Sequence, residues 1–230
     1  MDGQQKRIAL VTGATGGLGT AMCKTLFHDG YHVVANYRNR QKAEEWHHQM
    51  LGQGMNIDMA EGDVCDFNSM SIMVKGIEEK LGGVDVLVNN AGITRDGRFS
   101  RMSIDDWKAV IDTNLNSAFN VTRNVIEGMI ERKFGRIINI SSVNGQRGQF
   151  GQANYSAAKA GLHGFTKTLA MEVAKYGITV NTISPGYIAT DMVMAVKEEI
   201  RNQIIAQIPM GRSEEHTSEF QSRVDISYAV

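Results

Sequence analysis

Cysteine is scarce in this chain of 230 residues, which contains only Cys23 and Cys65. The two lie far apart in the sequence and form no CxxC motif, so we expect buried free thiols in a reducing compartment. The polar start, MDGQQKR, leads directly into a predicted strand, so we expect no signal peptide. Together these features predict a cytoplasmic protein.

Long apolar runs and an excess of charge of one sign are also missing. No apolar stretch approaches the roughly 20 residues that a membrane-spanning helix needs. The formal net charge is −1, so no global basic field favours nucleic acid or a membrane surface as a partner. His47 and His48 point to different faces of a predicted helix, and His163 is expected to be a packed helix residue, so no metal site is predicted.

Short β-branched runs alternate with longer helical patterns. Strands are predicted at residues 7–12, 32–37, 55–60, 84–92, 135–142 and 178–186. Helices are predicted up to residue 29, around 41–51, and at 67–81, 104–132 (with a break near Asp112) and 153–176. Apolar strands separated by helices predict an α/β fold, a doubly wound, Rossmann-like parallel sheet covered on both faces. Such sheets bind ligands at the carboxyl ends of their strands, where strand order reverses.

A single domain is predicted over residues 1–211, and the remaining residues differ from it. The segment RSEEHTSEFQSRVDISYAV follows Pro209 and Gly211, is polar and has no clear period. Its first part resembles the in-frame translation of a commonly used sequencing adapter. We therefore expect residues 212–230 to be a non-native tail that carries no functional information.

The first predicted strand runs into TGATGGLGT and then an amphipathic helix, which is the context that a dinucleotide fingerprint requires. Gly13 would permit the tight turn, Gly17 the close approach of a pyrophosphate, and Gly19 the packing of helix on strand. The helix N-terminus would face the anion. Glycine-rich turns occur everywhere, but this context predicts nucleotide binding.

The end of the second strand indicates which dinucleotide would bind. NAD sites place an acidic residue there for the ribose 2′-hydroxyl, whereas NADP sites use arginine for the 2′-phosphate. This chain reads ANYRNR, with Arg38 and Arg40 and no acid. Two surface arginines are usually only solvated charge, but at this position they favour NADP(H) as the cofactor.

The stretch NYSAAKAG holds Tyr155 and Lys159 four residues apart, so both side chains lie on one face of a predicted helix. Tyrosine and lysine are common at this spacing on exposed helices. The sharper interpretation is that the ammonium stabilises the phenolate and lowers the pKa of Tyr155, which makes the phenol usable as an acid–base group.

Six short motifs in order make the chain resemble the short-chain dehydrogenase/reductase family over roughly residues 6–211. They are TGATGGLG, NNAG (89–92), DTNL (112–115), NISS (139–142), YSAAK (155–159) and SPGYIAT (184–190). Within this family the chain looks most like NADPH-dependent acetoacetyl-CoA reductases, through stretches such as NNAGITRD and NISSVNGQRGQFGQANYS. The 3-oxoacyl-acyl-carrier-protein reductases share most of these motifs and are the alternative.

The resemblance implies reduction of acetoacetyl-CoA, an acyl-CoA thioester, to 3-hydroxybutyryl-CoA. Tyr155 would supply the proton, Ser142 would orient the carbonyl, and Lys159 would also bind the nicotinamide ribose. Asn114 would hold a water that relays the proton from solvent. Taken singly, Ser142 reads equally well as a strand-end cap and Asn114 as a helix-breaking polar residue, so the ordered set carries the prediction of catalysis.

The resemblance also implies contacts to the cofactor and the substrate. Asp63 would contact adenine, and Asn89 would support the turn near the cofactor. The remaining cofactor contacts would be Gly13, Gly17, Leu18, Gly19, Arg38, Arg40, Ala91, Gly92, Tyr155, Lys159, Pro185, Gly186, Ile188 and Thr190. The substrate contacts would be Asp96, Ser142, Gln149, Phe150, Gln152, Tyr155 and Tyr187, several of them in the polar loop VNGQRGQFGQAN, where structural turn residues are the alternative.

Two further expectations concern assembly and a different class of function. Family members form homotetramers and continue beyond residue 211 with another helix and a last strand, neither of which is recognisable here. We therefore expect this chain to be less stable than its relatives, through an exposed sheet edge. A non-catalytic NADP(H)-binding regulator is the alternative from another class, but such a protein has no need of the Tyr155–Lys159 pair.

Overall fold

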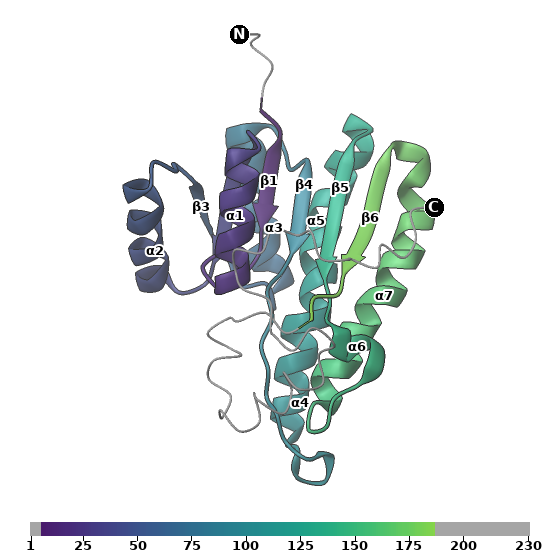
Figure 1. Cartoon of the computed structure of the whole chain (residues 1–230). Coiled ribbons are helices and arrows are strands. Elements are labelled where there is room, and N and C mark those ends of the chain that lie inside the picture. Colours follow the sequence, from purple (N-terminus) through teal and green to yellow (C-terminus); the bar gives the residue numbers. More distant parts are fainter. Residues whose placement is uncertain (1–5, 187–230) are drawn as a thin grey trace.

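The parallel sheet predicted from the sequence is present, with six strands in the order β3-β2-β1-β4-β5-β6 (Figure 1). The strands are β1 (Ile8–Val11), β2 (His32–Tyr37), β3 (Asp58–Glu61), β4 (Val86–Asn89), β5 (Gly135–Ile140) and β6 (Ile178–Ile183). Every neighbouring pair is parallel. This computed structural model describes residues 6–186, so the tail at 212–230 and the contacts expected at Tyr187, Ile188 and Thr190 lie outside the described residues.

Helices connect the strands and cover both faces of the sheet. They are α1 (Gly17–His28), α2 (Arg40–Gly52), α3 (Phe67–Leu81), α4 (Ile104–Ile111), α5 (Ser117–Arg132), α6 (Val143–Arg147) and α7 (Ala153–Val173). A π-helical turn, η2 (Asp112–Asn116), joins α4 to α5, and 3₁₀ turns lie at η1 (Phe99–Arg101) and η3 (Ala174–Tyr176). The doubly wound α/β fold is therefore confirmed.

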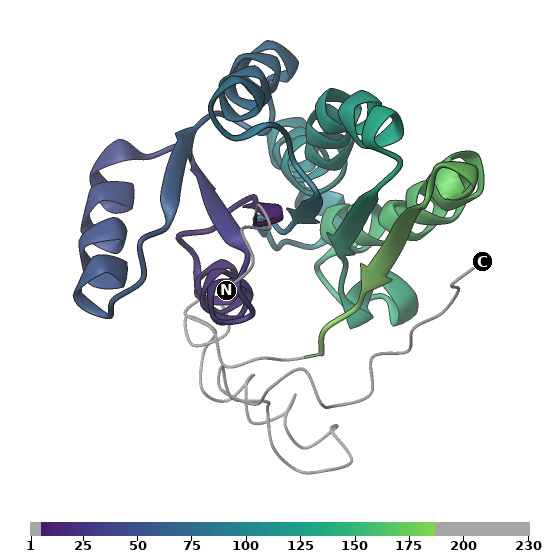
Figure 2. The ribbon, with the colours of Figure 1, turned by 90° about the horizontal axis from the view of Figure 1, so that it is seen from above.

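Side-chain alternation along the strands divides the interior into two cores. Ile8 and Leu10 of β1 pack on one face with α3 and α5, whereas Ala9 and Val11 pack on the other face with α1 and α2. Figure 2 shows these helix pairs on opposite sides of the sheet. A strand covered on both faces needs apolar residues at its odd and its even positions, which is why these runs are continuously apolar.

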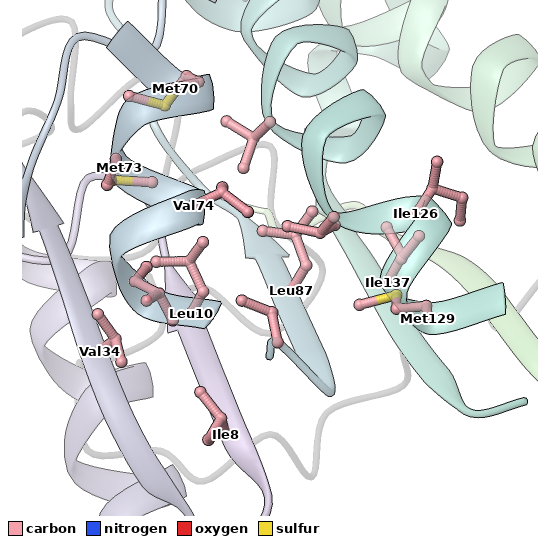
Figure 3. Packing of buried hydrophobic residues seen from close by; sticks show 14 of the residues in the cluster. Ile8, Leu10, Val34, Met70, Met73, Val74, Leu87, Ile126, Met129 and Ile137 are labelled. Carbon is pink, nitrogen blue, oxygen red and sulfur yellow. The ribbon is translucent and has the colours of Figure 1, made fainter. Parts of the chain in front are cut away.

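The core beneath α3 and α5 is dense in methionine and branched residues. Figure 3 shows Leu10 and Leu87 of adjacent strands facing Met70, Met73 and Val74 of α3. Methionine has three rotatable bonds and fills irregular gaps between branched neighbours. The core fixes the sheet, and the sheet brings the carboxyl ends of all six strands to one edge, near α4 and α6 (Figure 1).

The regular α-helix predicted over 104–132 is interrupted near Asp112 as expected, since α4 ends at Ile111, α5 begins at Ser117 and the π turn η2 joins them. Two local predictions are wrong. The polar loop after Ser142 contains the short helix α6. Cys65 is exposed, whereas Cys23 is buried as expected. Cys65 lies in the β3–α3 connection, outside the apolar stripe of either element, and its Sγ lies 3.4 Å from Thr113 Oγ1.

Within residues 6–186, no helix combines the length and the apolar character needed to cross a membrane.

Replacing Leu87 by Ala is expected to lower the free energy of unfolding by about 2–5 kcal/mol, because Leu87 is fully buried at the centre of the sheet. The matched control is Ile72→Ala on α3, whose side chain is 75% exposed and whose loss should change stability by less than about 0.5 kcal/mol. Urea denaturation followed by circular dichroism measures both. Equal effects of the two substitutions would contradict the assignment of the core.

Candidate active site

The turn between β1 and α1 has the shape of a phosphate cradle. Gly13 has φ +60°, and a Cβ there would lie 2.9 Å from Ala91 Cα, so both the conformation and the space favour glycine. A Cβ on Gly19 would collide with the Gly13 carbonyl oxygen. Gly17 and Leu18 begin α1, whose first turn holds no acidic residue and whose N-cap, Gly16, offers no side-chain acceptor. The first N–H groups of α1 are thus oriented to bind an anion, which fits a dinucleotide pyrophosphate.

A pair of residues that the sequence analysis did not select holds this cradle against β4. Thr12 Oγ1 accepts the N–H groups of Asn90 (2.9 Å) and Ala91 (3.1 Å). Asn90 Nδ2 donates in turn to the carbonyl oxygens of Thr12 (2.9 Å) and Gly13 (3.2 Å). These bonds cross the point where the strand order reverses. Thr12 belongs to the motif TGATGGLG and Asn90 to the motif NNAG, and this membership was the only sequence signal for either residue.

The two arginines predicted to select NADP(H) lie at the carboxyl end of β2, beside the cradle, since the Ala14 N–H donates to the Asn36 carbonyl at 3.3 Å. Arg38 is 73% exposed and its Nη1 lies 3.5 Å from Asp63 Oδ2. Arg40 is the first residue of α2, and its Nε lies 3.0 Å from Glu44 Oε1. Exposed ion pairs of this kind contribute about 0–1 kcal/mol, so either guanidinium can exchange its carboxylate for a phosphate.

Asn89, at the end of β4, is buried and turned into the protein. Its Nδ2 donates to Asn139 Oδ1 (2.8 Å) and Thr122 Oγ1 (3.1 Å), which ties β4 to β5 and α5. Its role in the turn beside the cofactor stays a prediction. The next residues, Ala91 and Gly92, reach the site: a Cβ on Gly92 would lie 2.6 Å from Asn114 Oδ1 and 3.6 Å from Lys159 Nζ.

Tyr155 and Lys159 lie in the first two turns of α7, on one face as predicted. Lys159 is only 4% exposed, and its Nζ donates to the Ile140 carbonyl oxygen at 2.7 Å. The same Nζ lies 5.7 Å from the centre of the Tyr155 ring. Burial lowers the pKa of Lys159 to about 8, so the amine is still mainly protonated at neutral pH. The structure therefore places a buried amine next to the phenol, as the predicted pairing of the two residues requires.

Ser142 follows β5 and is the N-cap of α6. Its Oγ accepts the Asn144 N–H at 3.2 Å, which leaves its own proton to donate. Ser142 can therefore cap α6 and also donate its hydroxyl proton to a substrate carbonyl. A Cβ on Gly145 would lie 2.8 Å from the Lys159 carbonyl carbon, so α6 rests directly on the turn of α7 that bears Lys159.

Asn114 is fully buried in the π turn, where it clamps the loop after β4. Its Oδ1 accepts the Ile93 N–H and its Nδ2 donates to the Ile93 carbonyl, both at 2.8 Å. The side chain thus fixes the loop that passes beside Lys159. Asn114 also lies in the π turn that interrupts the regular α-helix, which agrees with its other interpretation as a helix-breaking residue. The relay water proposed for Asn114 stays a prediction.

Several expected substrate residues meet in one polar chain. Gln152 Nε2 donates to Asp96 Oδ2 (2.9 Å), and Gln152 Oε1 accepts from Asn144 Nδ2 (3.0 Å). Phe150 is 80% exposed, and the Arg98 guanidinium carbon lies 5.7 Å from its ring centre. Gln149 lies in the same loop, which is joined to Gly97 by the Gly97 N–H donating to the Gly151 carbonyl at 2.8 Å. Asn144 is the member of this chain that the sequence analysis missed.

Comparison with known proteins agrees with this arrangement. The fold, with its strand order reversing at β1 and β4, is that of dinucleotide-dependent oxidoreductases. A family model described as short chain dehydrogenase matches residues 7–201, and the chain belongs to that family. Pro185 and Gly186, which follow β6, belong to the described part of the motif SPGYIAT.

Three relatives illustrate the range of similarity. An acetoacetyl-CoA reductase from Cupriavidus necator is 56% identical over 208 residues, which cover 90% of this chain and 85% of that protein. Nodulation protein G from Azospirillum brasilense is 59% identical with the same coverage. The 3-oxoacyl-[acyl-carrier-protein] reductase FabG from Vibrio cholerae is 43% identical, covering 90% of this chain and 83% of that protein. The chain is therefore an oxidoreductase of this family.

The buried amine predicts a stability that rises with pH. The unfolded lysine holds its proton up to about pH 10.5, whereas the folded one releases it near pH 8, so between these values the unfolded state binds more protons. Relative to Lys159→Met, the wild-type protein should gain about 2 kcal/mol in free energy of unfolding from pH 7 to pH 9.5. Urea melts at both pH values measure this, with exposed Lys108→Met as the control that should show no such gain. A parallel pH dependence of wild type and Lys159→Met would contradict the burial of a charged amine.

Proposed function

We propose that this chain reduces acetoacetyl-CoA to 3-hydroxybutyryl-CoA with NADPH. The observation that carries the proposal is the buried Lys159 ammonium beside the Tyr155 ring, on the turn of α7 that contacts the Ser142 segment. Two relatives that are acetoacetyl-CoA reductases, 56% and 58% identical over 90% of the chain, support the choice of substrate. A protein that only sensed NADP(H) would not need this constellation.

The residues near the carboxyl ends of the strands have different roles in this reaction. When bound, NADPH supplies a hydride to the ketone carbon of the substrate. Ser142 donates its free hydroxyl proton to the ketone oxygen and holds the carbonyl in place, while the Tyr155 hydroxyl protonates that oxygen as negative charge develops on it. The Lys159 ammonium stabilises the phenolate that remains, because it is held in a site with little water.

The residues around the cradle fit NADP(H). Gly13 allows the tight turn and Gly19 lets α1 pack closely on that turn, while α1, which begins at Gly17, would offer its first N–H groups to the pyrophosphate. Arg38 and Arg40 would hold the 2′-phosphate. Asp63 would then give up its ion pair with Arg38 and contact adenine instead. Lys159 would bind the ribose, with Ala91, Gly92, Pro185 and Gly186 around the nicotinamide.

On the same resemblance we propose that the protein acts in the cytoplasm and assembles as a homotetramer.

Asp96, Gln149, Phe150 and Gln152 would hold the acyl chain and thioester, because amides can hydrogen-bond a thioester carbonyl and an aromatic ring can pack an acyl group.

The second candidate is reduction of a 3-oxoacyl chain on an acyl carrier protein, which the similarity to the Vibrio cholerae protein supports. A competition assay separates the two: acetoacetyl-CoA and an acetoacetyl carrier protein are offered together with NADPH, and both products are quantified. A higher kcat/KM for the CoA thioester is expected. Preference for the carrier protein would replace the first candidate with the second.

Replacing Tyr155 by Phe should lower kcat by at least about a hundred-fold, because the general acid is removed while the ring that packs beside Lys159 is kept. NADPH oxidation followed at 340 nm measures the rate. Binding of NADPH, followed by fluorescence, should change by less than about two-fold, which shows that the site remains folded. Turnover near the wild-type rate would remove Tyr155 from the mechanism.

Replacing both Arg38 and Arg40 by Ala should raise the KM for NADPH about ten- to a hundred-fold and leave the KM for NADH nearly unchanged. The reason is that only NADPH carries the 2′-phosphate. Arg123→Ala on α5 is the matched control, because Arg123 also forms an exposed i,i+4 ion pair but lies on another element. A wild-type preference for NADH would contradict this assignment.

A further inference from the structure

The reaction proposed above needs Ser142 and Tyr155 at a fixed separation, yet the two residues come from different elements. Ser142 lies between β5 and α6, whereas Tyr155 and Lys159 lie on α7. Catalytic groups must be held within about 0.5 Å of the productive geometry, and that requires supporting contacts between their elements. The contacts between the end of β5 and α7 therefore set the separation of these groups.

Two reciprocal hydrogen bonds join these elements directly. Lys159 Nζ donates to the Ile140 carbonyl, and Ser141 Oγ donates to the Lys159 carbonyl, each at 2.7 Å. Ser141 therefore connects α7, the helix that carries Tyr155, to the adjacent Ser142. Its single hydroxyl proton is committed to the Lys159 carbonyl, because a carbonyl oxygen can only accept.

His163 lies one helical turn beyond Lys159 on α7 and completes this connection. Its Nε2 lies 3.2 Å from Ser141 Oγ and 3.4 Å from Ser184 Oγ. Since the Ser141 proton is already used, Ser141 Oγ is the acceptor at this contact and His163 Nε2 carries the hydrogen. Burial, and next the charge of Lys167, lower the pKa of His163, so the ring is neutral at pH 7 and Nε2–H is its only N–H donor.

The Ser184 contact extends the connection to β6 and α6. Ser184 directly precedes Pro185, whose carbonyl accepts the Val143 N–H at 3.0 Å. Gln146 Nε2 of α6 also donates to Ser184 Oγ, at 3.4 Å. The imidazole thus lies where the ends of β5 and β6 and the helices α6 and α7 converge, directly behind the catalytic groups.

We propose that His163 is a positioning residue of this reductase, which acts through Ser141 and Ser184 to hold Ser142 in register with Tyr155 and Lys159. The sequence analysis interprets His163 as a packed helix residue, and the structure adds that its Nε2 lies within hydrogen-bond distance of a hydroxyl oxygen at each strand end. This inference rests on the proposed function. His163 itself touches neither the substrate nor the cofactor in this assignment.

Kinetics of two substitutions at one position test the proposal. His163→Leu fills similar space without a donor and should lower kcat about five- to twenty-fold, with the KM for acetoacetyl-CoA changed by less than about two-fold. His163→Gln can present its Nε2–H at the same place and should keep kcat within about two-fold of wild type. His48→Leu makes the same chemical change at an exposed position of α2 and is the control. Wild-type kcat in His163→Leu, or equal loss in His163→Gln, would overturn the proposal.

A double-mutant cycle tests whether His163 acts through Ser141. Ser141→Ala and His163→Leu should each lower kcat, and the double variant should be no worse than the poorer single variant by more than about two-fold. Effects that multiply would show independent action and overturn this route. Should His163→Leu fail to fold, His163→Phe, which keeps an aromatic ring but has no N–H donor, replaces it in the cycle with Ser141→Ala.

Amide hydrogen exchange provides a readout that needs no turnover. Residues 141–147 should exchange about five-fold or more faster in His163→Leu than in wild type, and at the wild-type rate in His163→Gln and His48→Leu. Unchanged exchange in His163→Leu would overturn the positioning role. If wild type did not reduce acetoacetyl-CoA, the proposed function would fail, while the exchange data would still decide the role of His163.

Discussion

The structure depends on how one buried cation is held. Lys159 donates to the Ile140 carbonyl while its own carbonyl accepts from Ser141, so a strand end and a helix turn are fixed to each other by two short bonds. Burial of the amine disfavours its charged form, and the change in pKa from 10.5 to about 8 corresponds to roughly 3 kcal/mol. The fold tolerates that cost because two apolar cores anchor the sheet and α7 on which the cation lies.

A chain of hydrogen-bonded polar side chains also connects β4, β5, α7 and β6. Asn89 of β4 donates to Asn139 of β5, Asn139 donates to Thr166 of α7, and Thr166 pairs with Thr182 of β6 at 2.6 Å. Buried polar groups are costly unless they find their partners, so this network disfavours any other register of β4, β5, β6 and α7. The same elements carry Gly92, Ser142, Pro185 and the Tyr155–Lys159 pair, and the network therefore also sets the positions of the reacting groups.

Sequence reasoning succeeded where a local pattern determines the structure. Six β-branched runs and the glycine-rich turn sufficed for the doubly wound fold, and the spacing of Tyr155 and Lys159 sufficed for their shared helix face. It failed where long-range contacts decide. Asn114 in the π turn contacts Ile93, twenty-one positions away in the chain, and no periodicity signals that contact. Thr12, Asn90 and His163 act through partners on other elements, so their types alone did not distinguish them from ordinary polar residues.

The central claim is that the Lys159 amine is a buried cation whose charge is available to the phenol of Tyr155 near neutral pH. Nitrogen-15 NMR on lysine-labelled protein, with Lys159→Met to assign the signal, measures its titration directly. The account predicts a midpoint close to pH 8. A midpoint near 10.5, the value of a freely solvated lysine, would show that the amine faces water and would contradict the account.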